Sequence, residues 1–557
     1  MTSSLAIYIG AGAFASDRNP FGRTIANRQL YRAVALHGGF DPLTFVTQEA
    51  ATPEALSQTF GLDGAQPPPR LAQRASPEAR EAAIRSGVLF RGDPDLQDLA
   101  WERRAAAGDE AYSLVGLVHT LAPPALLQRM VNAAVAPTRP WDAQVCTSPS
   151  VRDALAGVYD AWDAYLADRF GGRPGPRPML PVVPLGVDGA RFARSADRPD
   201  ARAALRAELG LEADDVLVLW VGRLSFFEKA YPQSMFRALQ EAAAETGAHV
   251  HFAMAGWFPD ADADQRRYRE AAEAYAPQVR VTFENGNDQA RVADLWAGAD
   301  IFMSLVDNIQ ETFGLTPVEA MAAGLPVVVS DWDGYSFTVR DGQDGFLIPT
   351  LGGPLDGSGQ ALAWRHLMQV ESYQSYVGTV AQHTAVDVGR AARALAELIR
   401  SPELRRRMGA AGRARVAEVF DWPVVIGQFR ELFQELAQIR SAAAPEPERR
   451  ALNPVVIDPF RQFAGFATAT LAPATRLAIR PGATIDDLTR ANEIALDRVA
   501  SYVRAPFAQA VHAFGLIERG EAATVAEVLA KTPGQPAGPM RLTLAWMCKL
   551  GVLAWEA

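Results

Sequence analysis

Cysteine is scarce in this chain of 557 residues, because only Cys146 and Cys548 occur, far apart and outside any metal-ligand spacing. This pair predicts neither a disulfide framework nor a zinc site, and we expect a reducing, cytoplasmic setting.

No run approaches the ~20 apolar residues that a membrane-spanning helix needs. The apolar stretch 5–15 has no Lys or Arg before Arg18, so we expect a first strand there and not a secretory signal.

An excess of positive charge is also lacking. The formal net charge is -10 at pH 7 and the pI is about 5.4, which argues against nonspecific nucleic-acid binding or a strongly basic membrane surface. By contrast, 49% of the residues are hydrophobic and 21% are charged, as in ordinary globular proteins with sizeable cores. The length predicts about three domains.

The first 195 residues alternate strand-like and helix-like segments, which is typical of a doubly wound α/β domain. We expect a first strand at 7–9, a Gly10-Ala-Gly12 loop whose backbone approaches a ligand at Gly12, and a helix at 24–36. Further strands are expected at 44–47, 113–118, 143–146 and 181–184.

The richest motif lies at 311–330. Thr316 is a candidate N-cap, Pro317 suits the first helical position, and Glu319 would complete a capping box. Gly324 predicts the helix end, and the β-branched run 327–329 predicts a buried strand. The free N–H groups near the start of such a helix favour an anion.

Glu311 and Glu319 also have interpretations that involve no catalysis or ligand binding. Glu319 could serve only as a capping residue and Glu311 only as a solvated loop charge. A glycosidase acid–base pair is another alternative: eight helical positions span about 12 Å, against about 5–9.5 Å between glycosidase carboxylates. A loop could shorten that distance, so both alternatives stay open on the residues alone.

The frame Glu311-Thr-Phe-Gly-Leu-Thr-Pro-Val-Glu319-Ala-Met-Ala-Ala-Gly-Leu-Pro-Val resembles the retaining glycosyltransferases of family 4. The resemblance implies the GT-B fold, in which two Rossmann-like domains face each other. It also implies that Glu311 contacts the donor sugar and Glu319 the nucleotide ribose. The donor would lie against the backbone of Phe313, Gly314, Leu315 and Thr316.

A second match follows a strand-like run at 216–221. Gly222 and Arg223 open the loop at the carboxyl end of that strand, where open α/β sheets bind ligands, and Lys229 follows. Arg223 and Lys229 could be ordinary surface cations. The resemblance instead implies that they hold the diphosphate of the donor, although the spacing here is one residue longer than the commonest form.

Three further positions carry predictions. His119 ends a strand, and it is either a hydrogen-bonded structural residue or, as in the family, a residue near the donor. Gly286 and Asn287 would line the nucleobase side, by analogy of position with relatives.

The Asp331-Trp-Asp333 triplet suggests a divalent metal, since other glycosyltransferases use D-x-D. The same pattern recurs at 93/95, 260/262 and 262/264, and the triplet alone supplies too few oxygens. We therefore expect no metal ligands and no cofactor besides the nucleotide-sugar substrate.

The remaining chain is divided as follows. Residues 196–424 would form the nucleotide-sugar domain, with a variable insertion at 351–384 that is either a surface excursion or an acceptor-side lid. Residues 425–440 would be a helix returning to the first domain, 441–456 a linker, and 457–557 a helical module loosely similar to a winged helix. Residues 480–557 hold eight basic and eight acidic residues, so homo-oligomerisation or partner docking is favoured over DNA binding.

The predicted protein is thus an α/β enzyme, a retaining glycosyltransferase that moves a hexose-type sugar from a nucleotide-diphosphate sugar to a hydroxyl of a glycan, lipid-linked or protein acceptor. Surface polysaccharide or glycoconjugate synthesis in bacteria, with peripheral contact at the inner face of the cytoplasmic membrane, is the setting that the family implies. The alternatives are a noncatalytic GT-B scaffold and a regulator that acts through the tail.

Overall fold

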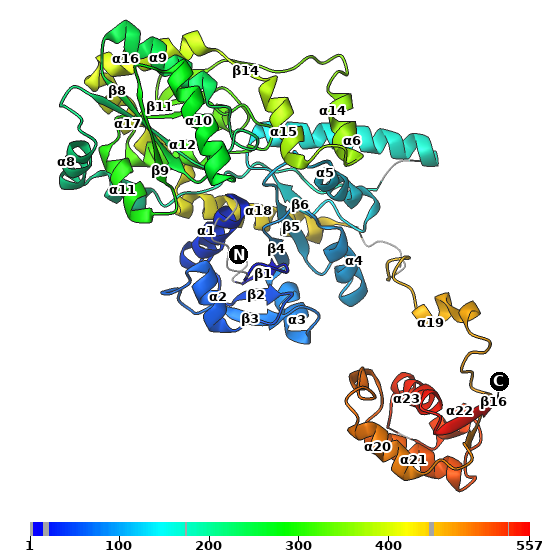
Figure 1. The fold of residues 1–557 in the computed structure, drawn as a ribbon. Helices are drawn as coiled ribbons and strands as arrows, with labels where there is room; N and C mark the ends of the chain where they lie inside the picture. The colour runs from blue at the N-terminus through cyan, green and yellow to red at the C-terminus, as the bar shows by residue number, and fades with distance from the viewer. Residues whose placement is uncertain (1–3, 15–21, 173–174, 445–450, 533, 557) are drawn as a thin grey trace. The chain divides into compact units, whose positions relative to one another are not determined.

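The structure is a computed structural model that describes residues 4–14, 22–172, 175–444, 451–532 and 534–556 (Figure 1). The chain divides into two compact units, residues 1–452 and 453–557.

The first sheet of unit 1 is parallel, with strand order β3-β2-β1-β4-β5-β6. Its strands are β1 (Leu5–Ile9), β2 (Leu43–Thr47), β3 (Arg70–Gln73), β4 (Val88–Arg91), β5 (Ser113–Leu117) and β6 (Ala143–Val145). Its helices are α1 (Gly22–His37), α2 (Pro53–Phe60), α3 (Pro77–Ser86), α4 (Gln97–Ala106), α5 (Pro124–Val131), the 3-10 helix Asn132–Val135 and α6 (Pro149–Phe170). The strand expected at 181–184 was wrong, because this segment makes only isolated bridges such as Cys146 to Val182.

The second sheet is also parallel, with strand order β12-β11-β10-β7-β8-β9. Its strands are β7 (Val216–Val221), β8 (Val250–Gly256), β9 (Arg280–Asn285), β10 (Ile301–Ser304), β11 (Val327–Ser330) and β12 (Gly345–Ile348). The associated helices are α7 (Gly189–Ala196), α8 (Pro199–Glu208), α9 (Gln233–Thr246), α10 (Ala261–Tyr275), α11 (Gln289–Gly298), α12 (Leu315–Ala323), α13 (Tyr335–Thr338), α16 (Val388–Arg400) and α17 (Pro402–Arg415), followed by a π-helix at Val416–Phe420.

Helix α18 (Trp422–Ala442) leaves the second sheet and packs against α1 of the first. Arg430 Nη1 donates a hydrogen bond of 2.7 Å to the Gly38 carbonyl, and Arg440 Nη1 donates one of 2.8 Å to the Gly87 carbonyl. Glycine at 186 permits this crossing, because a Cβ there would lie 2.4 Å from the Trp422 ring. Two parallel six-stranded sheets with flanking helices form the GT-B fold, so the predicted fold class of unit 1 is confirmed.

The segment 351–384 is a helical excursion from the second sheet. The short strands β13 (Thr350–Leu351) and β14 (Ala385–Val386) pair antiparallel at its base. Between them lie α14 (Gln360–Leu367) and α15 (Tyr373–Gln382), shown in yellow-green in Figure 1.

Unit 2 is mostly helical and has a core of its own, built around Leu488, Phe514, Met540 and Leu544. Its helices are α19 (Pro459–Gln462), the 3-10 helix Ala464–Phe466, α20 (Ile485–Glu493), the 3-10 helix Ser501–Val503, α21 (Phe507–Glu518), α22 (Val525–Ala530) and α23 (Ala537–Lys549). Strands β15 (Arg476–Ile479) and β16 (Leu553–Glu556) pair antiparallel. The winged-helix likeness stays a prediction, and residues 445–450 of the predicted linker lie outside the described residues.

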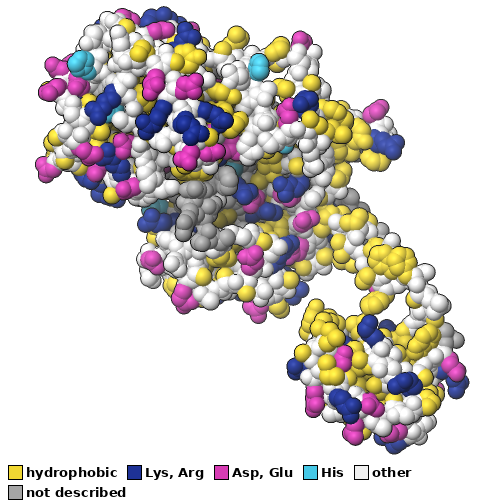
Figure 2. Space-filling view, in the orientation of Figure 1, with side chains coloured by type: hydrophobic (Ala, Val, Ile, Leu, Met, Phe, Trp, Pro, Cys, Tyr) yellow, Lys and Arg dark blue, Asp and Glu magenta, His cyan; other side chains and the backbone are white. Residues whose placement is uncertain are grey.

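Acidic and basic side chains are interspersed over the face of the molecule that Figure 2 shows. Within the described residues, none of the helices has both the length and the apolar character that crossing a bilayer requires.

Candidate active site

The predicted cations and Glu311 meet where the strand order of the second sheet reverses. The loops that follow neighbouring strands β7 and β10 leave the same edge there, which is where open α/β sheets bind ligands. Lys229, from the first loop, forms an ion pair with Glu311 Oε2, from the second. Their side chains are only 19% and 14% exposed, so the pair lies largely out of water.

The two partners keep each other charged. Burial alone would raise the pKa of Glu311, but the Lys229 ammonium and hydrogen bonds from the backbone outweigh it, and the pKa lies below its usual range. Burial likewise opposes the charge on Lys229, but Glu311 raises the pKa of the amine above its ordinary value. Both groups are ionised at neutral pH, so Glu311 is an oriented carboxylate and cannot act as a general acid.

Arg223 has an acidic partner that the sequence analysis missed. Its Nη1 donates a hydrogen bond of 2.5 Å to Glu228 Oε2, and the Glu228 side chain is only 9% exposed. Gly222 directly follows β7, and its N–H donates to the Ala255 carbonyl at 2.9 Å. Each predicted diphosphate ligand is therefore held by a carboxylate, Arg223 by Glu228 and Lys229 by Glu311.

The capping box predicted for Thr316 and Glu319 was wrong. Helix α12 begins at Leu315, its N-cap is Gly314, and Thr316 lies inside the first turn. Gly314 has φ 93°, and a Cβ there would lie 2.2 Å from the Tyr335 ring, so packing as well as backbone conformation requires glycine. Phe313 is buried and stacks edge-on against Phe420, which leaves its backbone and not its ring to face a ligand.

The Glu319 side chain therefore does not cap α12. Burial raises the pKa of its carboxyl to about 7, and the charges of Arg191 and Lys229 only partly offset this. Among the described residues, none forms a hydrogen bond with the Glu319 side chain. Glu319 can therefore bind a ligand hydroxyl without breaking a hydrogen bond within the protein.

His119 reaches the same place from the first sheet. Its Nε2 lies 2.9 Å from Asn27 Oδ1, and burial lowers the pKa of the ring to about 4, so it is neutral. The carbonyl of His119 accepts a hydrogen bond of 2.8 Å from Thr312 Oγ1. Thr312, which the sequence analysis missed, follows Glu311 directly, and its own carbonyl accepts a 3.1 Å bond from Thr147 Oγ1. The structure therefore brings His119 to the Glu311 loop.

The Asp331–Asp333 triplet is engaged in structural bonds. Asp333 has φ 46° and accepts a 3.2 Å hydrogen bond from Ser148 Oγ of the first sheet's α6, while Asp331 accepts from Ser336 Oγ at 2.5 Å. Burial and the charge of Glu311 raise the pKa of Asp333 to about 7. In the described part of the chain, no three His, Cys, Asp or Glu residues cluster in a way that could hold a metal ion.

Three predicted residues lie apart from the Lys229–Glu311 pair. Gly286 and Asn287 follow β9, two strand spacings from β7, or about 10 Å along the sheet edge. Gly286 is pressed against Gly256, since a Cβ would lie 2.7 Å from the Gly256 Cα. Gly12 follows β1 in the first sheet, and its N–H donates to Glu49 Oε1 at 3.1 Å.

Asp307 is another buried acid that sequence reasoning missed. It is 3% exposed, burial raises its pKa well above the usual range, and the Tyr231 N–H donates to it at 3.4 Å. It ties the end of the Arg223–Lys229 loop to the segment after β10. One sequence signal for this loop was available, because Lys229 is the only lysine before Lys531.

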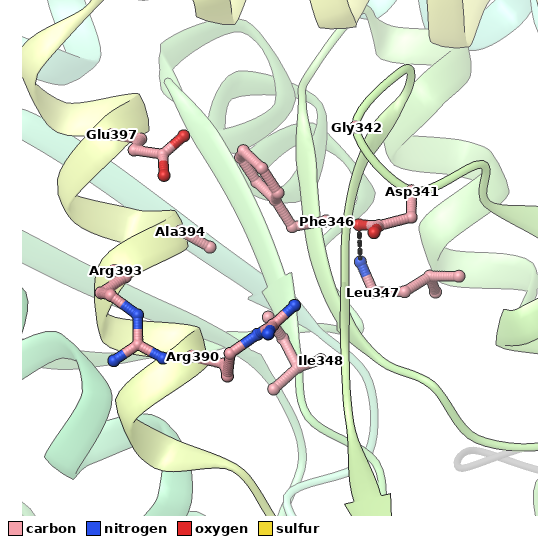
Figure 3. Close-up of a pocket in the computed structure, with 9 residues that line it drawn as sticks. All are labelled: Asp341, Gly342, Phe346, Leu347, Ile348, Arg390, Arg393, Ala394 and Glu397. Carbon is pink, nitrogen blue, oxygen red and sulfur yellow. Dashed lines mark hydrogen bonds between the residues drawn. The ribbon is translucent and has the colours of Figure 1, made fainter.

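A separate cavity of about 250 Å³ lies between β12 and α16 (Figure 3). Arg390 and Arg393 line it from the helix, and Asp341 Oδ1 accepts a hydrogen bond of 2.9 Å from the Leu347 N–H on its other wall. It contains none of the predicted site residues.

The second sheet is similar in sequence to a known protein family. Residues 201–351 match the family model "Glycosyl transferases group 1". A D-inositol 3-phosphate glycosyltransferase of Nocardia farcinica is 34% identical over 175 residues, which are 31% of this chain and 37% of that protein. One of Rhodococcus erythropolis is 27% identical over 298 residues, 52% of this chain and 63% of the relative. The chain thus covers less than two-thirds of both relatives.

Among solved structures, sucrose-phosphate synthase from Thermosynechococcus elongatus is similar, with 19% identity over 78% of this chain and 100% of that chain and a TM-score of 0.49. The matched residues 201–351 carry Arg223, Lys229, Glu311 and Glu319, so the similarity to glycosyl transferases group 1 includes the candidate site.

Proposed function

We propose that the protein is a retaining glycosyltransferase that transfers a hexose-type sugar from a nucleoside diphosphate sugar to a hydroxyl acceptor. The observation that carries the proposal is the buried Lys229–Glu311 pair, with Arg223 on the same strand-end loop as Lys229, at the strand-order reversal of a glycosyl transferases group 1 domain. Relatives named D-inositol 3-phosphate glycosyltransferases support the reaction class.

The diphosphate of the donor would bind at Arg223, Lys229 and the first N–H groups of α12. An arginine fork suits phosphate oxygens, a lysine adds a point charge, and a helix N-terminus favours anions. Both cations already have carboxylate partners, so the diphosphate shares them and does not meet isolated charges. This arrangement keeps the site neutral when no phosphate is bound, which lowers the cost of burying it.

The sugar and the nucleoside of the donor would extend in two directions from the diphosphate. Glu311 would orient the sugar, and Glu319 the ribose. The nucleobase would lie toward Gly286 and Asn287, about 10 Å along the sheet edge from β7.

Transfer would occur on one face of the sugar. The leaving phosphate takes the proton of the acceptor hydroxyl while the new glycosidic bond forms, so no protein nucleophile is required. The work of the protein is then orientation and stabilisation of the departing diphosphate. We propose that Arg223, Lys229 and the α12 N-terminus supply this stabilisation without a divalent cation, and that no further cofactor takes part.

The most direct test is whether the protein binds the nucleoside diphosphate that the donor releases. Thermal unfolding of the full chain with UDP, GDP and ADP should show stabilisation by one of them, because a ligand that binds only the folded state raises its stability. The matching sugar nucleotide should then be hydrolysed slowly in water and used faster with an acceptor, D-inositol 3-phosphate included. The same assay with EDTA tests metal independence.

Two outcomes would redirect the assignment. Nucleotide binding without hydrolysis or transfer would indicate a noncatalytic scaffold. Salt-sensitive DNA binding by residues 453–557, with no nucleotide-dependent stabilisation of the full chain, would favour the regulator. Surface polysaccharide synthesis and contact with the inner membrane face are further proposals. Comparing turnover with different acceptors in the same assay tests the first of them.

A further inference from the structure

Helix α15 of the 351–384 segment contacts the candidate site from outside both sheets. Tyr373 Oη donates a hydrogen bond of 2.8 Å to Gln310 Oε1, and Gln310 directly precedes Glu311. The Thr120 side chain, which directly follows His119, lies near enough to the same phenol to lower its pKa. One side chain therefore joins the sequence neighbours of two predicted site residues that belong to opposite sheets.

Two more contacts fix α15 to the loop after β7. Gln374 Nε2 donates to Glu228 Oε1 at 3.3 Å, and the other oxygen of Glu228 holds Arg223. Gly378 lies so close to Phe227 that a Cβ would be 3.0 Å from its ring. The helix is thus anchored on the same loops that carry Arg223 and Glu311, which disfavours a loose surface excursion.

The Tyr373 hydroxyl is suited to bridge the two loops. Burial raises the pKa of Tyr373 and the charge of Glu228 raises it further, so the phenol remains protonated at neutral pH. A neutral phenol can donate one hydrogen bond and accept another. It donates to Gln310, and its oxygen is then available to accept from the Thr120 hydroxyl.

We propose that Tyr373 is a positioning residue, which fixes the Gln310–Glu311 loop and joins it to the His119–Thr120 strand end. This inference rests on the proposed function, since it assumes that Glu311 orients a sugar. Arg223 and Lys229 hold the diphosphate independently of Tyr373. Loss of the hydroxyl therefore lowers kcat, through misplacement of Glu311 and His119, more than it weakens nucleotide binding.

The test compares Tyr373→Phe with Tyr376→Phe in the full chain. Tyr376 lies on the same helix, its ring stacks on His366 at 5.1 Å, and no hydrogen bond of its hydroxyl is recorded within the described ranges. The probe is whichever of UDP, GDP and ADP stabilises the wild type, followed by the matching sugar nucleotide for kcat. Tyr373→Phe should lower kcat by about twofold to tenfold, the value of one ordinary hydrogen bond. Its nucleotide affinity and melting temperature should match those of Tyr376→Phe.

Thr120→Val removes the bridge from the other side and covers the case in which Tyr373→Phe folds poorly. It should reproduce the loss of kcat at unchanged nucleotide affinity. Wild-type kcat in both variants, or equal losses in Tyr373→Phe and Tyr376→Phe, would overturn the positioning role and leave the transferase assignment intact. A wild-type protein that neither binds nor uses any of the nucleotides would overturn both.

Discussion

The two sheets of unit 1 share a topology but differ in the chemistry at their reversal points. In the second sheet, the β7 and β10 loops bring together two cations and two acids, namely Arg223, Lys229, Glu228 and Glu311. In the first sheet, the corresponding strands are β1 and β4. The ion pair near the end of β4, Arg23 with Asp93 at 3.0 Å, is more exposed to water, with side chains 63% and 36% exposed, and neutral hydrogen-bonding groups lie beside it. Asn27 Nδ2 donates to the Gly92 carbonyl at 3.0 Å.

This difference shows what the fold leaves to the side chains. A parallel doubly wound sheet provides a ligand-binding edge wherever its strand order reverses. An edge with largely buried ion pairs and a helix N-terminus suits an anionic diphosphate. An edge whose ion pair is exposed and lies beside neutral groups offers hydrogen bonds that an acceptor hydroxyl can use. Four measurements can break or sharpen this division, in order of decreasing expected effect.

Arg223→Ala should cause the largest change if the second sheet stabilises the leaving diphosphate. We expect kcat/KM to fall about 100- to 1,000-fold, as when one preorganised donor to a developing charge is removed. The melting temperature should fall as well, because the change leaves the largely buried Glu228 carboxylate without its cation, so turnover is compared at a temperature at which all variants are folded. Arg390→Ala, in the cavity between β12 and α16, is the matched control and should retain wild-type turnover. Near-wild-type turnover in Arg223→Ala would refute the charged-edge assignment.

Glu311→Ala should cost both activity and stability. It leaves the Lys229 charge buried without its partner, and we expect about 1–3 kcal/mol of destabilisation, less than for a fully buried pair. The double variant Glu311→Ala/Lys229→Met should recover much of that stability without recovering transfer. Urea unfolding measures the cycle. If the single and double variants are equally stable, the pair is solvated and the second sheet differs less from the first than the structure indicates.

The framework of this division could be predicted from the sequence, because strand-end loops follow from hydrophobic runs. The apolar run 216–221 and the frame around Glu311 place their loops at one sheet edge without knowledge of packing. The start of α12 could not be predicted, because it depends on contact between Gly314 and the distant Tyr335 ring. Strand β3 was missed because only Ala72 of its four residues is buried, so it has no apolar run, and β4 was missed although its first three residues are apolar and buried. The contacts of Tyr373 with Gln310 and Thr120 could not be predicted either, because they join residues far apart in sequence.

Asn27→Ala tests the neutral groups at the edge of the first sheet. Removing the hydrogen bonds of Asn27 to the His119 ring and the Gly92 carbonyl should reduce acceptor-dependent transfer by about twofold to tenfold. Nucleotide affinity, measured by calorimetry, should remain as in the wild type because no cation of the second sheet is touched. A weakened nucleotide affinity would show that the first sheet also contributes to the donor site.

The pH dependence of stability separates the two edges by sign, and its slope at any one pH is shallow because each titration extends over several pH units. The pKa of Glu319 is raised from 4.5 to about 7, so the folded state retains its proton longer and loses stability as the pH rises from about 4.5 to 7. The pKa of His119 is lowered from 6.5 to about 4, so the stability that its neutral form contributes is lost as the pH falls from about 6.5 to 4.

Glu319→Gln should therefore reduce the loss of stability as the pH rises from about 4.5 to 7. His119→Gln should reduce the loss of stability as the pH falls from about 6.5 to 4. Unfolding free energies from urea titrations at pH 4, 5.5, 7 and 8, without nucleotide, measure both slopes. Because Glu319 does not cap α12, Glu319→Gln should be at least as stable as the wild type at pH 8. Lower stability at that pH would restore a structural role for the carboxylate and remove the reason to assign it to a ligand.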